Sequence, residues 1–174
     1  KQNNALLDQV YQLIKKVSFL EKSNINNSFK NNNINSFNKI QVNNYGCENI
    51  DYITDKVFKK LLNTPMSAIP KLIELKYFNP EHPENHNIRI TNKKEKFIKV
   101  FKNNKWQLED KKQVIDNMVD KGKSILDEHR DKQLHSEFKN QCYDHFSEKF
   151  ENDDKDLKKK INTDVELVIL NNTD

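Results

Sequence analysis

Two histidines in one short loop are the side chains of this chain best suited to chemistry. The loop, residues 81–87, reads E-H-P-E-N-H-N, so His82 and His86 have glutamates and asparagines beside them. Such groups can bind a divalent metal, and one histidine could then act as the general base of a nuclease. A loop stiffened by Pro83, with asparagine side chains bonded to nearby backbone, explains the same residues without a metal. His82 and His86 are therefore kept only as metal-ligand candidates, with no catalytic residue and no cofactor expected.

A basic stretch follows this loop and is suited to contact nucleic acid. Between residues 89 and 105 seven side chains are basic and only Glu95 is acidic. Basic side chains can follow a phosphate backbone, and Phe97 or Phe101 could stack on bases if exposed. The pattern also fits a solvated strand face whose lysines block edge pairing. The predicted nucleic-acid-binding residues are Arg89, Lys93, Lys94, Lys96, Lys99, Lys102 and Lys105.

Composition and missing motifs exclude several other classes of function. Two glycines in 174 residues leave no glycine-rich phosphate loop and no dinucleotide fingerprint. Cys47 and Cys142 lie far apart without a C-x-x-C pair, so no zinc finger is encoded. No signal peptide and no long apolar run is present, which predicts a protein that is neither secreted nor membrane-bound. The net charge of +4 reflects a Lys-rich and Asn-rich composition, so by itself it does not indicate a nucleic-acid partner.

The elements that would position these side chains predict an α+β fold. Apolar residues alternate in four short segments, which predicts a small antiparallel sheet. Asn103-Asn104 suits a two-residue hairpin turn, because asparagine tolerates left-handed backbone angles. The predicted strands are residues 38–43, 87–91, 96–102 and 105–109.

The two faces of the 96–102 strand are both apolar, which predicts a central strand. Trp106 and Leu108 are expected to face the core on the last strand. A single buried group is expected from Leu72, Ile73, Ile98, Val100, Trp106, Val114 and Met118. The outward strand positions are expected to carry Arg89, Lys99 and Lys105.

Helices are expected both before and after the strands along the sequence. Asp51 or Thr54 can cap a helix that runs to Leu62, and Ser67 can cap a helix over 67–78 with Pro70 in its first turn. Apolar spacing after a capping box at Asp110 and Gln113 predicts helical structure over 111–150, with a second long helix from about Leu134. A last helix is expected after Asp153 or Asp154, with a strand over 165–170 as the alternative.

The first residues carry a heptad pattern. The apolar residues are spaced 4, 3, 4 and 3 apart, with valine and leucine alternating, as in parallel two-stranded coiled coils. Residues 1–22 therefore predict an N-terminal coiled-coil helix that forms a dimer or higher homo-oligomer, although an amphipathic helix lying on its own domain would show a similar stripe. An Asn-rich linker over 23–37 and an α+β module over 38–174 complete the predicted organisation. The oligomerisation residues are Leu6, Val10, Leu13, Val17 and Leu20.

Several motifs resemble a module of mimivirus-type giant DNA viruses. They are YGCENIDYIT at residues 45–54, then HPENHNI at 82–88 and a strand pair ending in KW at 105–106. The resemblance covers about residues 40–172 and points to a zinc-finger/coiled-coil protein family. This chain departs from the family at Cys47, where a basic residue is common, and at Lys76, where histidine is common.

The resemblance implies a viral, oligomeric, DNA-associated protein. Family members carry a two-cysteine, two-histidine finger upstream, which this chain lacks. The chain begins with Lys1 rather than Met, so residue 1 is expected not to be the native start.

The expected function is a non-enzymatic viral module. It would assemble through its coiled coil and contact nucleic acid, such as DNA, or a viral protein. A structural virion or scaffold protein and a metal-dependent nuclease centred on the HPENHN loop are the alternatives. The expected location is the host cytoplasm, at the viral factory, or the virion.

Overall fold

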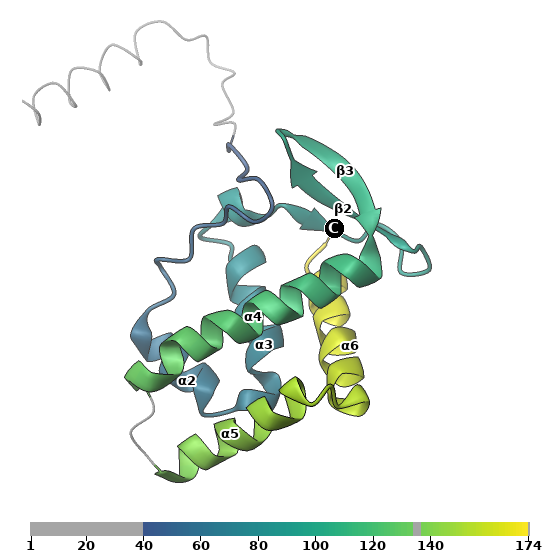
Figure 1. Ribbon diagram of the computed structural model, residues 1–174. Helices are drawn as coiled ribbons and strands as arrows, with labels where there is room; N and C mark the ends of the chain where they lie inside the picture. Colours follow the sequence, from purple (N-terminus) through teal and green to yellow (C-terminus); the bar gives the residue numbers. More distant parts are fainter. Residues whose placement is uncertain (1–39, 134–136, 174) are drawn as a thin grey trace, which may run out of the picture. The chain divides into compact units, whose positions relative to one another are not determined.

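A small sheet and a group of helices make up the part of the chain that this computed structural model describes, residues 40–133 and 137–173 (Figure 1). The predicted α+β fold is confirmed. The coiled-coil and linker predictions for 1–22 and 23–37 lie outside the described residues. The elements are α2 (Asp55–Leu62), α3 (Pro65–Tyr77), the 3-10 turn η1 (Pro83–Asn85), β1 (Ile88–Arg89), β2 (Phe97–Lys102), β3 (Lys105–Asp110), α4 (Lys111–Gln133), α5 (Glu137–Glu151) and α6 (Lys155–Asn171).

The sheet has three antiparallel strands in the order β1-β2-β3, so the prediction that β2 is central is confirmed. Asn103 and Asn104 form the predicted turn between β2 and β3, with φ of 52° and 60°. These left-handed angles match the twist of a two-residue hairpin.

The predicted strand over 38–43 is wrong for its described part, because residues 40–43 form no strand. The segment is held by separate contacts instead of a ladder: Asn43 N donates to Glu84 O at 2.7 Å, and Tyr45 N donates to Phe101 O at 2.7 Å. Asparagine side chains also take backbone partners here, and such bonds compete with strand pairing.

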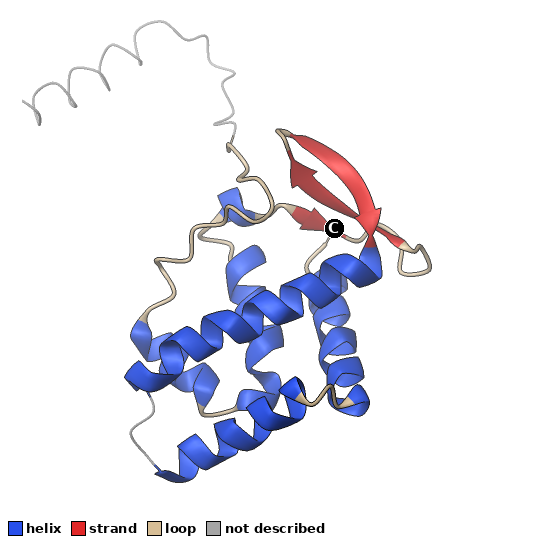
Figure 2. Ribbon diagram, viewed as in Figure 1, coloured by secondary structure: helices blue, strands red, loops and turns tan. Residues whose placement is uncertain are grey.

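One face of the sheet packs on helices. Ile98 and Val100 are 1% and 0% exposed, and α4 contacts β2 and β3 while α6 contacts β1. In Figure 2 the helices lie together below the sheet. The sheet therefore has an inner face on the core and an outer face away from these helices.

The start of α3 differs from the prediction. The helix begins at Pro65 rather than after Ser67, so Pro70 lies inside the helix and not in its first turn. Proline is favoured at the first helical position, where a missing N–H costs nothing. This preference sets the start of α3 three residues earlier than a cap at Ser67 would.

The later helices agree with the prediction in number, and the expected start of the second long helix at Leu134 lies outside the described residues. Asp110 Oδ1 accepts from Gln113 N at 2.8 Å to cap α4, and Asp154 caps α6 by accepting from two backbone N–H groups. Residues 165–170 belong to α6, which excludes the alternative strand. Gly122 allows α4 to approach α3 closely, since a Cβ there would lie 3.1 Å from Ile69 Cγ2. No helix within the described residues is long and apolar enough to cross a membrane.

Candidate nucleic-acid interface

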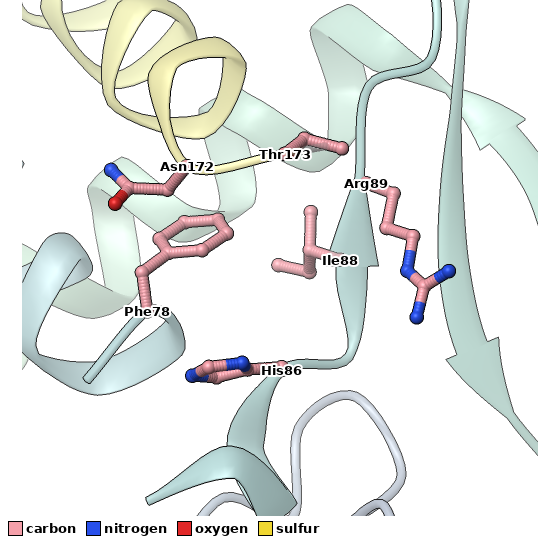
Figure 3. Close-up of a pocket in the computed structure, with 6 residues that line it drawn as sticks. All are labelled: Phe78, His86, Ile88, Arg89, Asn172 and Thr173. Atoms are coloured by element: carbon pink, nitrogen blue, oxygen red, sulfur yellow. The ribbon is translucent and has the colours of Figure 1, made fainter. Parts of the chain in front are cut away.

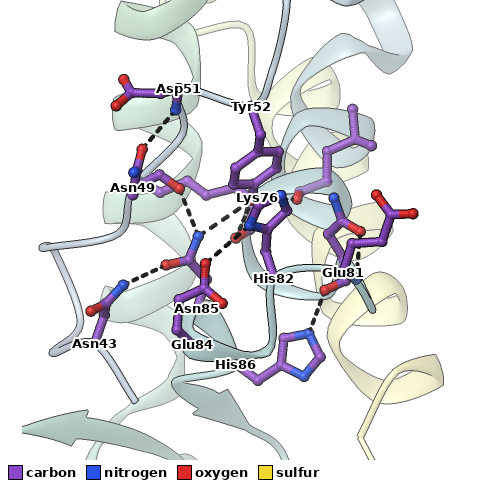
Figure 4. Close-up of polar contacts among 12 residues, drawn as sticks. Asn43, Asn49, Asp51, Tyr52, Lys76, Glu81, His82, Glu84, Asn85 and His86 are labelled. Carbon is purple, nitrogen blue, oxygen red and sulfur yellow. Dashed lines mark hydrogen bonds and ion pairs between the residues drawn. The ribbon is translucent and has the colours of Figure 1, made fainter. Parts of the chain in front are cut away.

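The two histidines of the HPENHN loop have separate partners. His82 stacks on Tyr52 with ring centroids 3.5 Å apart, and its Nδ1 lies 3.0 Å from Glu84 Oε1. His86 Nε2 lies 2.9 Å from Asn79 O (Figure 4). Each ring uses one nitrogen for its polar partner, Nδ1 in His82 and Nε2 in His86. Among residues 40–130 and 139–173, whose side chains the structure describes, no three His, Cys, Asp or Glu form a group that could hold a metal.

The asparagines of this loop are its buried part. Asn85 is fully buried, donates to Asn49 O at 2.7 Å and to Tyr52 Oη at 3.3 Å, and accepts from Asn43 Nδ2 at 2.9 Å. Figure 4 shows these contacts converging on Asn85. Asn87, also fully buried, donates to Asn43 O and to Glu48 Oε1. The loop therefore ties the 43–52 segment to the start of β1.

Glu48 and Lys76 form a buried ion pair beside these asparagines. The side chain of Glu48 is 1% exposed and that of Lys76 is 12% exposed. Glu48 Oε1 accepts from Gly46 N at 2.7 Å and from Asn87 Nδ2 at 2.8 Å. Glu48 Oε2 lies 3.1 Å from Lys76 Nζ, an ionic contact without hydrogen-bond alignment. The polar cluster is defined here as Asn43, Glu48, Asn49, Tyr52, Lys76, Asn85 and Asn87.

Two tyrosines next to Glu48 are held in the neutral state. Burial, followed by the charge of Glu48, raises the pKa of Tyr45 and of Tyr77 above the usual value for a phenol. Lys76 and Lys102 lie over the Tyr77 and Tyr45 rings, at 5.0 and 5.2 Å from the centroids. The arrangement fits a structural role, because the phenols stay neutral and the charges of Glu48 and Lys76 pair with each other.

The outer face of the sheet carries aromatic and basic side chains. The register pairs Phe101 with Trp106 and Lys99 with both Arg89 and Leu108, and paired residues share a face. Phe97 is 54% exposed and Leu108 is 62% exposed. The outer face is defined here as Arg89, Phe97, Lys99, Phe101, Trp106 and Leu108.

The prediction that Trp106 and Leu108 face the core is wrong. The two-residue turn fixes the register, so Trp106 lies on the face opposite Ile98 and Val100. Trp106 is half-buried, with its ring centroid 5.5 Å from that of Phe101 in an edge-on contact. The other six residues of the predicted buried group are buried as expected: Leu72, Ile73, Ile98, Val100, Val114 and Met118.

Arg89 lies across the middle of the outer face. Its guanidinium is 4.3 Å from the centroid of the Trp106 ring, which places a strand-β1 side chain over a strand-β3 side chain. A guanidinium stacked on an aromatic ring keeps its N–H edge available for a phosphate. None of the ion pairs found among the described residues includes Arg89 or Lys99.

The seven predicted basic residues lie in three places. Arg89 and Lys99 are on the outer face, and the exposed turn over residues 91–96, named here the basic turn, carries Lys93, Lys94 and Lys96. Lys102 and Lys105 share the side of Ile98 and Val100, which corrects the expectation that Lys105 points outward. Lys102 pairs with Glu109 at 2.5 Å. Five of the seven therefore gather around the outer face.

A cavity of about 240 Å³ borders β1 on the other side. In Figure 3 Ile88 points into this cavity, whereas Arg89 points away from it toward the neighbouring strands. The cavity lies next to the outer face but shares only Arg89 with it. Its lining consists of Phe78, His86, Ile88, Arg89, Asn172 and Thr173.

The outer face had a signal in the sequence, whereas the polar cluster did not. A two-residue turn at 103–104 pairs residue 101 with 106 and 99 with 108, so the face of Trp106 and Leu108 follows by counting. The contact of Glu48 with Lys76 joins residues 28 positions apart, and no local pattern points to it.

Comparisons of the chain with protein-family models, with curated proteins and with solved structures found no match. The resemblance to a giant-virus family accordingly stays a prediction.

Proposed function

We propose that this protein is a non-enzymatic viral module that contacts nucleic acid through the outer face and the basic turn. The observation that supports the proposal is the combination of exposed Phe97 and Leu108 with five neighbouring basic side chains. Basic groups supply affinity for phosphates, and exposed aromatic rings supply surfaces for bases.

The acidic side chains nearest this surface already have partners. Glu95 accepts from Asn92 Nδ2 at 3.3 Å, and Asp110 caps α4. These neutral donors leave both carboxylates charged, but five basic side chains outnumber the two acids, which leaves a surface of positive sign around the aromatic residues. The positive electrostatic potential of this surface attracts polyanions before any specific contact forms.

Assembly and location belong to the same proposal. The heptad of residues 1–22 would join two or more copies, which multiplies the basic surface and its effective concentration. The resemblance to the giant-virus family supports an action at the viral factory in the host cytoplasm or in the virion.

Deletion of residues 1–22 is expected to lower the mass of the particle in light scattering to that of a smaller species. The reason is that the apolar seam, once removed, can no longer pair copies of the chain. Replacing Leu6 and Leu13 with lysine should have the same effect without shortening the chain. An unchanged mass in both variants would mean that another surface drives assembly.

Replacing Lys93, Lys94, Lys96 and Lys99 with glutamine is expected to weaken binding to nucleic acid and reduce its salt dependence. Each lost phosphate contact should lower the log–log salt slope by about 0.7 for single strands or 0.9 for duplex. Fluorescence anisotropy of a labelled oligonucleotide at several salt concentrations measures both quantities.

A matched control replaces Lys56, Lys59, Lys60 and Lys71 with glutamine, which removes the same charge from α2 and α3. The control should keep the salt slope of the parent protein. Equal slopes for both variants, or no binding at low salt, would overturn the proposal in favour of a scaffold protein. Cleavage of the oligonucleotide with added Mg²⁺, lost in His82→Ala, would favour the nuclease.

A further inference from the structure

The central strand alternates aromatic and basic groups on the outer face. Phe97, Lys99 and Phe101 occupy successive outward positions of β2, about 6.6 Å apart along the strand. Across the strands, Lys99 lies between Arg89 and Leu108, and Phe101 lies beside Trp106. Cations and flat apolar surfaces are thus interleaved in both directions.

The exposed ring of Phe97 contributes little to the stability of the fold. Phe97 is 54% exposed, so its ring gains little from burial in the described part of the chain. A base has a flat aromatic face of its own, and stacking on such a ring removes apolar surface of both partners from water.

A double helix could not use this surface well. In a duplex the base faces are stacked on each other, and only phosphates and base edges reach a protein. The outward side chains at Phe97, Phe101 and Leu108 have no donor or acceptor with which to read base edges. Only an unpaired strand presents base faces to a flat aromatic surface.

A protein partner fits less well than a polyanion. Lysine is depleted from protein interfaces, whereas here Lys99 lies between Arg89 and Leu108 at the middle of the outer face. The basic turn adds Lys93, Lys94 and Lys96 at one edge. The charge therefore complements a phosphate backbone running beside the stacked bases.

We infer that the outer face binds single-stranded nucleic acid, with bases stacked on Phe97 and on the Phe101–Trp106 pair and phosphates held by Arg89, Lys99 and the basic turn. This inference rests on the proposed function and specifies its ligand. Arg89 is already placed over Trp106, so little side-chain freedom is lost when it takes a phosphate.

The test compares a labelled single strand of about 16 nucleotides, of mixed sequence, with a duplex of equal length on the full chain. The single strand is expected to bind more tightly at each salt concentration. Phe97→Ala should weaken single-strand binding roughly 5- to 150-fold, the range for loss of one stacked base, while the salt slope stays unchanged. Phe97→Tyr should restore most of the affinity, because it restores the ring.

Two further readouts separate stacking from charge and from unfolding. Trp106 is the single tryptophan of the chain, so quenching of its fluorescence by the single strand reports contact at the outer face. Leu167→Ala removes a comparably exposed apolar side chain on α6 and should leave binding unchanged. Thermal melts should be alike for both alanine variants.

The outcomes distinguish the inference from the proposed function. Equal or tighter duplex binding, or unchanged single-strand affinity in Phe97→Ala, overturns the inference but leaves nucleic-acid contact in place. Failure to bind either oligonucleotide at low salt overturns both. Tighter single-strand binding, with Phe97 dependence and Trp106 quenching, supports both.

Discussion

Replacing Glu48 with alanine is expected to lower the free energy of unfolding by about 3–5 kcal/mol, because it breaks a buried ion pair and leaves one charge without its partner. The side chain of Glu48 is 1% exposed and has three contacts: Gly46 N, Asn87 Nδ2 and Lys76 Nζ. Alanine would leave the Lys76 ammonium without its ionic partner and remove one of the two acceptors of the buried Asn87 Nδ2. Urea unfolding, followed by circular dichroism, measures the loss.

A matched control uses an ion pair at the surface. Asp153 pairs with Lys158 at 2.7 Å, but its side chain is 72% exposed. Asp153→Asn should change the free energy of unfolding by less than about 1 kcal/mol, since exposed pairs contribute little and asparagine tolerates the φ of 56° at this position. Glu48→Gln should fall between the two variants, because the amide oxygen can keep one hydrogen bond. Equal losses for Glu48→Ala and Asp153→Asn would show that the buried pair does not stabilise the fold.

The polar cluster also matters for the outer face. Asn87 contacts Asn43 and Glu48 through its side chain, and its backbone O accepts from Phe101 N at 2.8 Å. Loss of Glu48 would therefore loosen the entry to β1, which carries Arg89. A weakened single-strand affinity in Glu48→Gln, at temperatures where the protein is folded, would reflect this link.

Local signals explain what the sequence could predict of the fold. Asn103-Asn104 forms the expected turn because asparagine accepts positive φ, and Asp110 caps α4 because its carboxylate reaches the Gln113 N–H. Each of these features depends on residues within a few positions of one another. Helix boundaries followed the same rule, except at α3, where Pro65 was a stronger start signal than Ser67.

Trp106 and Leu108 show where a pattern is ambiguous. Alternation places both on one face of β3, but a period of two does not say which face meets the core. The size and apolarity of Trp106 and Leu108 suggest that they are buried. The register shows otherwise, because the buried Val100 and Ile98 pair with Gln107 and Glu109 instead. Gln107 and Glu109 thus lie on the inner side, at the rim of the core.

Long-range polar contacts could not be predicted. Asn85 bonds to groups 33 to 42 residues away, and Glu48 reaches Lys76 and Asn87. Nothing in the residues next to Asn85 distinguishes a buried asparagine from the many exposed ones in this chain. Such contacts depend on how the whole domain packs. The spacing of residues in a single sequence does not predict that packing.

The two faces of the sheet should respond very differently to the same kind of truncation. Ile98→Ala is expected to lower the free energy of unfolding by about 2–5 kcal/mol, because the side chain is 1% exposed and its loss leaves a cavity. Leu108→Ala should change it by no more than about 0.5 kcal/mol, since its side chain is 62% exposed. Urea unfolding of both variants under one set of conditions gives the comparison.

The comparison of Leu108→Ala with Ile98→Ala tests whether the side chains of the outer face stabilise the fold. If Leu108 contributes little to stability, an exposed leucine beside Arg89 and Lys99 is better explained by a ligand than by folding. A loss at Leu108→Ala as large as that at Ile98→Ala would mean that Leu108 contributes to folding, and its exposure would then give no support to a ligand on the outer face.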